Sequence, residues 1–189
     1  RIDVIKEQTG SDTVDIVAHS MGGLVARSYA ETGEQAKNID QLITIGTPHR
    51  GAPVAYLRWE AGDGFFVLSE RILKHHFTQE AEESGFADIY DLIRQQIFSV
   101  QQLLSIDDYL FDVASNSLRT YADNYPRNEF LEQLNANADR LDMIRKKVAI
   151  SGDTGDTTIT RIRVTEEIDG EKWQHGKPEN FDNEETDRG

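Results

Sequence analysis

Ser20 stands between two short segments of different pattern, in surroundings that suit a reactive hydroxyl. Residues 14–18 form a mostly apolar, β-branched run, which is typical of a buried parallel strand. Residues 21–32 have the apolar spacing of an amphipathic helix. A serine on a strand-to-helix turn, with a small residue two positions before it and glycine two positions after it, matches the nucleophile-elbow pattern.

The physics of such a turn predicts the role of each neighbour. The turn is tight enough to strain the serine backbone and to lift its hydroxyl clear of the sheet. Ala18 and Gly22 are small, and we expect this to prevent clashes between strand and helix. The helix points its first N–H groups and its positive dipole end at the same spot. We therefore expect the Met21 N–H to donate to a developing oxyanion, an interaction worth about 3–4 kcal/mol of barrier. The alternative is that Ser20 only caps the helix.

The elements around the turn indicate an α/β fold with a parallel sheet. Residues 42–45 form a second strand, stopped by Gly46 and Pro48. Strand, helix and strand follow one another within about 35 residues, as in a βαβ unit, so the two strands should run parallel with a right-handed crossover. Residues 147–150 form the next strand. The intervening 100 residues or so are too long for an ordinary connection, and their apolar periodicity predicts an inserted helical cap.

The chain beyond residue 152 is expected to add a β-hairpin. Residues 157–164 alternate between two faces, as a strand does. Asp169 and Gly170 suit a two-residue hairpin turn, and residues 171–173 are the expected return strand.

Composition excludes several classes of function. The chain has 189 residues and a formal charge of -14, which argues against binding to phosphate backbones or to anionic lipid surfaces. It has no cysteine, so disulfides, thiolate zinc sites and cysteine nucleophiles are excluded. No apolar run approaches the ~18 residues of a membrane helix, no signal peptide is visible, and a cytoplasmic location is slightly favoured. We expect no metal, no organic cofactor, no nucleic-acid partner and no stable membrane insertion.

Two stretches resemble a known superfamily. Residues 18–27 and 42–53 look like the corresponding parts of α/β-hydrolases, and most like the lecithin:cholesterol acyltransferase-like lipases and esterases. The Gly-Thr-Pro-His-x-Gly segment at residues 46–51 is the more specific element. The resemblance implies a partial α/β-hydrolase core over residues 1–58 and 141–189, with a helical cap or lid inserted over residues 59–140.

The resemblance also implies a reaction. Ser20 would attack a hydrophobic, lipid-like ester, form an acyl-enzyme, and pass the acyl group to water or to another alcohol. Residues 65–77 carry an apolar stripe that would line an acyl pocket, move as a lid, or simply pack on the body. Two alternatives stay open: a hydrolase of small esters or thioesters, and an inactive binding module with the same fold.

A serine nucleophile needs a histidine base oriented by a carboxylate, and the superfamily order is serine, acid, histidine. His19 adjoins Ser20 and is expected to pack in the turn. His49 precedes every plausible acid, so we expect a loop residue near the site. His75 and His76 are expected on a helix surface.

The remaining partners fall late in the chain or outside it. Asp153 and Asp156 follow the third strand, and His175 is the one histidine late enough in sequence. In the resembled family the acid usually follows an extra β-excursion, which implies that acid and histidine lie beyond Gly189, with Asp156 and His175 as the in-chain fallback. Since residue 1 is arginine and the first oxyanion loop would precede it, we expect this chain to be a piece of a longer protein.

Overall fold

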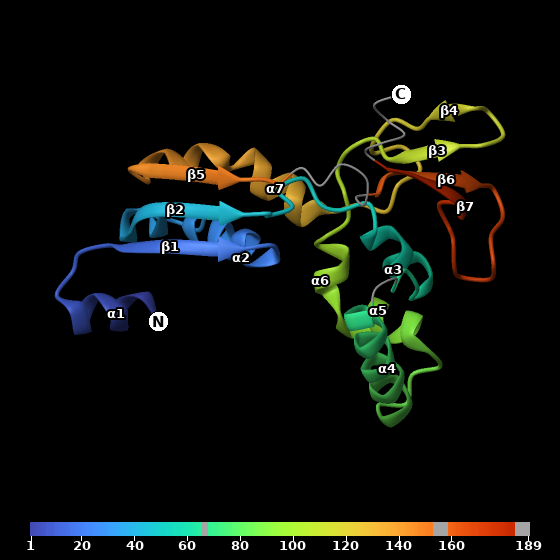
Figure 1. The fold of residues 1–189 in the computed structure, drawn as a ribbon, viewed down its shortest axis with the longest axis horizontal. Helices are drawn as coiled ribbons and strands as arrows, with labels where there is room; N and C mark the ends of the chain where they lie inside the picture. The colour runs from blue at the N-terminus through green and yellow to red at the C-terminus, as the bar shows by residue number, and fades with distance from the viewer. Residues whose placement is uncertain (66–67, 153–158, 184–189) are drawn as a thin grey trace. The chain divides into compact units, whose positions relative to one another are not determined.

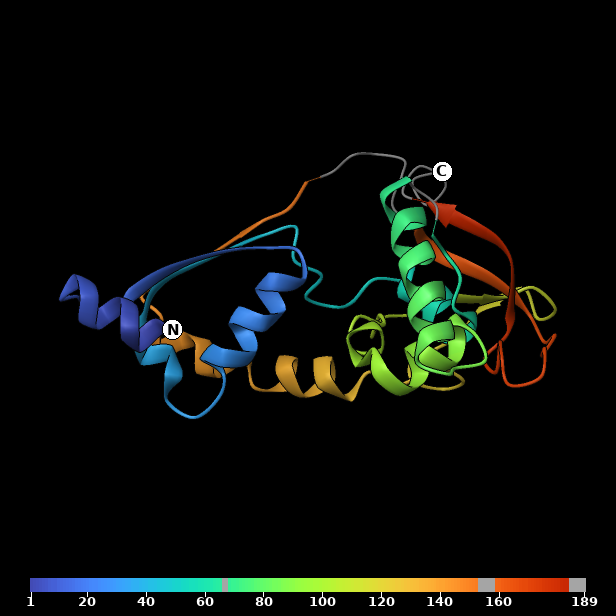
Figure 2. The same ribbon diagram turned by 90° about the horizontal axis from the view of Figure 1, so that it is seen from below.

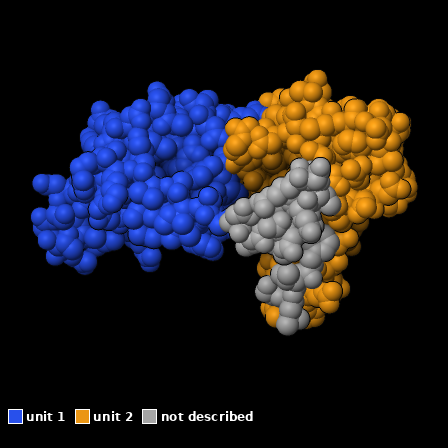
Figure 3. Space-filling model, turned by 45° about the horizontal axis from the view of Figure 1, so that its top comes forward, with its two compact units in different colours: residues 1–49, 129–153 blue, residues 50–128, 154–189 orange. Residues whose placement is uncertain are grey.

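A computed structural model describes residues 1–65, 68–152 and 159–183 (Figure 1). The chain forms two compact units, each built from two stretches of sequence (Figure 3). Unit 1 comprises residues 1–49 and 129–153, and unit 2 comprises residues 50–128 and 154–189.

Unit 1 holds the three strands that the sequence predicts, and they form a parallel sheet in the order β1-β2-β5. β2 starts earlier than expected, and its register places Val17 beside Ile43 and Ile43 beside Val148. The βαβ prediction is therefore confirmed. The elements of this unit in chain order are α1 Ile2–Thr9, β1 Val14–His19, α2 Met21–Ala30, η1 Gln35–Asn38, β2 Ile39–Ile45, α7 Glu129–Ala136, η2 Ala138–Met143 and β5 Lys146–Ile150.

The core of unit 1 lies on one face of this sheet. Helix α2 packs there through its buried residues, and α7 lies on the same side (Figure 2). The opposite face leaves large apolar side chains in solvent, with Val17 65% and Ile150 49% exposed. The buried apolar cluster under α2 consists of Ala30, Ala36, Ile39, Leu42 and Ile144.

Unit 2 combines helices with a second sheet, in the order β4-β3-β6-β7. Its core is rich in tyrosine: Tyr56, Tyr109 and Tyr125 are all buried. The Tyr125 hydroxyl accepts the backbone N–H groups of Tyr109 and Leu110, which fixes the start of β3. The elements are α3 Ala55–Ala61, α4 Leu68–Glu83, α5 Ile89–Gln96, α6 Phe98–Gln101, β3 Leu110–Asp112, β4 Ser117–Leu118, β6 Ile159–Thr165 and β7 Lys177–Asn183.

The sequence pattern predicts a helical segment between β2 and β5, but this long segment is not helical throughout. It contains β3 and β4, and β3 pairs in parallel with β6, which places Leu110 beside Ile162. A three-residue strand whose partner lies 52 positions further along the chain leaves no local periodicity to detect. The division into a core (residues 1–58 and 141–189) and a cap (residues 59–140) stays a prediction, and the bounds of the two units differ from it.

The expected return strand at residues 171–173 is wrong, because the strand that pairs with β6 is β7, from Lys177 onward. The turn at Asp169–Gly170 does form, since Asp169 and Lys172 exchange backbone hydrogen bonds of 3.2 and 2.9 Å. The chain then leaves the ladder because the Trp173 N–H donates to the Glu60 carbonyl at 3.1 Å. The turn is thus the tip of a longer connection.

Candidate active site

Ser20 occupies the turn between β1 and α2, in unit 1. Its φ of 53° and ψ of -133° lie in a region that residues with a side chain rarely adopt, and such strain costs about 1–3 kcal/mol. The Ser20 N–H donates to the Ile45 carbonyl of β2 at 2.9 Å, which anchors the turn to the sheet. Ser20 is exposed. The turn is therefore strained and open to solvent, as the elbow pattern predicts, whereas the nucleophilic role of its hydroxyl stays a prediction.

The first turn of α2 comes close to the loop after β2 at Gly23, and not at Gly22 as the pattern suggested. A Cβ built on Gly23 would lie 2.0 Å from Thr47 Oγ1, so only glycine fits against that side chain. A Cβ on Gly22 would meet no other atom of the described residues within 4 Å, save its immediate neighbours in the helix. Successive residues of a helix point about 100° apart, so one of the two adjacent glycines faces the β2 loop and the other faces away.

Met21 opens α2, whose 10 residues make it a full helix. The first N–H groups of any α-helix have no partner within the helix, and the dipole concentrates positive potential there. This is the electrostatic setting that an oxyanion needs, and the Met21 N–H remains the predicted donor. The Met21 side chain is 43% exposed.

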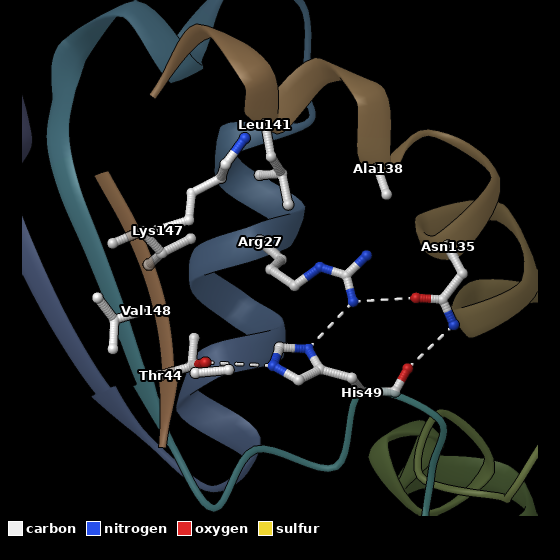
Figure 4. A pocket seen from close by; sticks show the side chains of 10 residues that line it. Arg27, Thr44, His49, Asn135, Ala138, Leu141, Lys147 and Val148 are labelled. Carbon is white, nitrogen blue, oxygen red and sulfur yellow. Dashed lines mark hydrogen bonds between the residues drawn. The ribbon is translucent and has the colours of Figure 1, made fainter. Parts of the chain in front are cut away.

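The structure places His49, in the loop that follows β2, in a polar network within unit 1. Its Nδ1 lies 3.1 Å from Arg27 Nη1, and its Nε2 lies 3.2 Å from Thr44 Oγ1 (Figure 4). A guanidinium only donates, so Nδ1 must accept, and the ring proton must sit on Nε2 and point to Thr44. Burial first, and then the charge of Arg27, lower the pKa of His49 below its ordinary value. The contacts therefore favour the tautomer with its proton on Nε2, and the lowered pKa favours the neutral ring.

Arg27 is the centre of this network and is 4% exposed. Its Nε donates to Glu31 Oε1 at 2.9 Å, and its Nη1 donates to Asn135 Oδ1 at 3.0 Å. Asn135 Nδ2 in turn donates to the His49 carbonyl at 3.0 Å, which closes a ring of contacts from α2 through α7 to the loop. Burial raises the pKa of Glu31, although Arg27 opposes that shift.

A cavity of about 370 Å³ opens beside this network, between the sheet and the helices α2 and α7 (Figure 4). Its walls are mostly apolar, and its polar part comes from Arg27, Thr44, His49, Asn135 and Lys147. The lining residues are Arg27, Leu42, Thr44, His49, Asn135, Ala138, Leu141, Lys147, Val148 and Ala149.

Sequence reasoning missed Arg27 and Asn135. A signal for Arg27 was available, because it lies three positions after Leu24 on the buried face of the helix and four before Glu31. A basic and an acidic residue spaced i, i+4 on an inward face indicate a buried ion pair. No local signal exists for Asn135, whose contact with Arg27 spans 108 residues.

The other histidines have other surroundings. His19 is exposed at the end of β1, and His75 and His76 are exposed on α4. His175 belongs to unit 2, where its Nδ1 lies 3.1 Å from Oε1 of Glu60, a carboxylate that is only 1% exposed. Sequence reasoning did not consider that carboxylate.

The structure does not bear on the two acids that the sequence offers after the third strand. Asp153 and Asp156 lie outside the described residues. The expectation that acid and base follow Gly189 stays a prediction. Within the described ranges, no group of three or more histidine or acidic side chains is arranged to hold a metal ion.

A parallel βαβ sheet with an exposed serine on a strained strand-to-helix turn defines the class as α/β-hydrolase-type. The family model described as PGAP1-like alpha/beta domain matches residues 2–150, and the chain belongs to that family. None of the helices in the described part of the chain has both the length and the hydrophobicity for crossing a membrane.

Curated relatives match shorter stretches. A GPI inositol-deacylase of Phaeosphaeria nodorum is 31% identical over 77 residues, which cover 40% of this chain and 7% of that protein. Triacylglycerol lipases of Pseudarthrobacter phenanthrenivorans and Burkholderia plantarii are each 43% identical over 47 residues, 25% of this chain and 14% and 13% of theirs. The chain thus spans only a small part of each relative. The crystal structure of the Tle4–Tli4 complex shows 14% identity and a TM-score of 0.35, over 75% of this chain and 36% of that chain.

Proposed function

We propose that this chain carries the nucleophile of a serine-dependent hydrolase that cleaves hydrophobic, lipid-like esters. The observation that carries the proposal is the backbone of Ser20, which is strained at φ 53° and exposed at the first turn of α2. Strain of this kind persists only where the surrounding structure holds it, and it is concentrated at functional sites. Membership in the PGAP1-like family supports the same reading.

The proposed reaction has two steps. Ser20 Oγ attacks the ester carbonyl carbon while a general base takes its proton, and the carbonyl oxygen becomes an oxyanion facing the Met21 N–H. The C–O bond to the alcohol breaks, the alcohol leaves with the proton from the base, and the acyl group stays on Ser20. Water then attacks the acyl carbon while the base takes a proton from it, the bond between that carbon and Ser20 Oγ breaks, and Oγ takes the proton back as the acid leaves. The base and its acid partner are proposed to follow Gly189.

Two observations support a hydrophobic ester. The relatives with the matching stretches are named triacylglycerol lipase and GPI inositol-deacylase, and both names denote cleavage of acyl groups. Met21 directly follows Ser20, and Val25 lies one turn further along α2. Their side chains are 43% and 64% exposed, so the helix that begins at the serine presents apolar side chains to solvent. On α4, Ile72 and Leu73 of the apolar stripe are also exposed.

The finer assignment to the lecithin:cholesterol acyltransferase-like lipases is part of the proposal, as is transfer of the acyl group to an alcohol instead of water. It rests on the Gly-Thr-Pro-His-x-Gly segment at residues 46–51. A hydrolase of small esters or thioesters and an inactive binding module are the competing functions.

A fluorophosphonate probe tests the proposal on the naturally expressed protein. We expect the probe to label Ser20, and Ser20→Ala to abolish labelling. Ser28→Ala, on the same helix, is the matched control and should label like the wild type. Absence of labelling in the wild type supports the inactive module. Labelling that survives Ser20→Ala contradicts the nucleophile assignment. Comparing p-nitrophenyl esters of short and long acyl chains then separates small-ester from lipid hydrolysis.

A further inference from the structure

We infer that His49 is a positioning residue for Ser20: through its neutral Nε2–H tautomer it holds the loop of residues 46–49 against the first turn of α2. The inference rests on the proposed function, because it concerns Ser20 as the nucleophile. The contacts themselves all lie within unit 1. It assigns a role to a side chain that reaches Ser20 through Thr47 and Gly23.

The His49 side chain is held by contacts on both ring nitrogens. His49 joins three elements at once: Nδ1 accepts from Arg27 of α2, Nε2 donates to Thr44 of β2, and the backbone carbonyl accepts from Asn135 of α7. Each ring nitrogen has one defined role, so the ring orientation is fixed by opposing bonds (Figure 4). A surface loop residue would not need two buried partners.

A series of contacts leads from His49 to Ser20. The His49 N–H donates to the Thr47 carbonyl at 2.9 Å, which folds the loop back on itself. The Thr47 side chain is the one that packs against Gly23, at a distance that leaves no room for a Cβ. The Gly23 N–H donates to the Ser20 carbonyl at 3.0 Å. A continuous set of contacts therefore connects the imidazole to the strained turn.

A second ring proton on His49 would reverse the contact with Arg27. Protonated Nδ1 would point an N–H at the Arg27 guanidinium, so an attractive contact at 3.1 Å would become a repulsive one. The charges around the ring do not compensate. Glu31, which follows α2, is already paired with Arg27, and on β5 the cationic Lys147 lines the same cavity and pairs with Asp142.

The remaining neighbours of His49 do not make a protonated ring more favourable. From α7 the ring network receives Asn135, which is uncharged, and from η2 Arg140 donates to the Glu31 carbonyl. The charge that acts on the His49 ring among the described residues is Arg27, and it opposes an imidazolium. Acidification should therefore release the loop and disturb the serine turn.

The test compares three variants by the rate of fluorophosphonate labelling between pH 5 and pH 8. His49→Asn keeps an acceptor near the Nδ1 position but cannot titrate, whereas His49→Leu keeps the volume and loses both bonds. We expect labelling of His49→Leu to fall about tenfold or more at every pH, since small misplacements of reacting groups cost up to about 100-fold. His49→Asn should keep a labelling rate near that of the wild type at pH 8, and its rate should decrease less than the wild-type rate as the pH falls to 5. His76→Asn, on the exposed surface of α4, is the control for a histidine outside the network.

A second measurement does not depend on Ser20 chemistry. Nitrogen-15 NMR of the histidine side chains should show His49 with an unprotonated Nδ1 at neutral pH, and hydrogen exchange of residues 46–49 should quicken in His49→Leu but not in His49→Asn. If the wild type never labels, this measurement still decides the positioning role. An Nδ1–H tautomer, or wild-type exchange and labelling in a folded His49→Leu, overturns the inference.

Discussion

At the scale of single residues, the site depends on a buried cation. Arg27 is stable inside unit 1 because every side of its guanidinium meets an acceptor: Glu31, Asn135, the Leu134 carbonyl and the His49 ring. A buried ion pair of this kind contributes little net stability, but removing one partner leaves an uncompensated charge in the core. The consequence is a strong asymmetry between single and paired substitutions.

Arg27→Met should lower the free energy of unfolding by about 3–5 kcal/mol at pH 7, because Glu31 is then buried without its partner. Burial already raises the pKa of Glu31, and losing Arg27 raises it further. A carboxyl whose folded pKa exceeds its unfolded pKa favours the folded state at low pH, and this stabilisation is lost as the pH rises through the folded pKa. The deficit of Arg27→Met should therefore be smaller at pH 5 than at pH 8, as urea unfolding would measure.

Two further variants separate charge from packing in this prediction. Arg27→Met combined with Glu31→Gln should recover part of the lost stability, since no buried charge remains. If Arg27→Met does not fold, Arg27→Lys measures what the planar set of donors contributes to stability while the positive charge is retained. A deficit that does not change with pH would contradict the assignment to Glu31.

Residues differ in how far the sequence reveals them. Ser20 was found because its pattern is local: strand, serine, glycine and helix follow one another directly. His49 was expected near the site, but its tautomer depends on Arg27, 22 positions away, and on Thr44. Such contacts are tertiary, so the sequence predicted the nucleophile turn but not the network that supports the loop beside it.

At the scale of elements, the first turn of α2 packs against the loop after β2 at Gly23. Gly23→Ala should destabilise the protein by about 1–3 kcal/mol, because its Cβ would overlap the Thr47 side chain. Gly22→Ala is the matched control: its Cβ has open space among the described residues, and alanine favours the helix, so stability should stay level or rise by up to about 1 kcal/mol. Thermal unfolding of both variants gives the comparison. Equal effects of the two substitutions would contradict the close contact.

The same scale shows where pattern reading succeeds. β1, β2 and β5 were predicted because a parallel strand, buried or half-buried, reads as a continuous apolar run. β3 and β4 were not, since they are two or three residues long and gain their stability from β6 and from the Tyr125 hydroxyl. The turn at Asp169–Gly170 was recognised, but Trp173 and its bond to Glu60 redirect the chain afterwards.

At the scale of the whole molecule, net charge is the dominant long-range term. A formal charge of -14 repels itself in the compact state, and salt screens that repulsion. Raising NaCl from about 10 to about 150 mM should raise the melting temperature by about 2–4 °C, equivalent to ~1 kcal/mol. Differential scanning calorimetry at pH 7.5 measures this. Near the isoelectric point of about 4.7 the salt effect should vanish, and a decrease at pH 7.5 would show that ion pairs dominate instead.

The parallel pairing of β2 with β5 has a consequence for the order of assembly during translation. Gln41 of β2 lies beside Lys146 of β5, and the 105 positions that separate them take about 5–20 s to synthesise at 5–20 residues/s. β1, α2 and β2 have left the ribosome by then, so one edge of β2 waits without a neighbouring strand. An open edge of this kind recruits other chains. Cellular chaperones that cover nascent strands should therefore decide the yield of this protein more than the speed of its local folding.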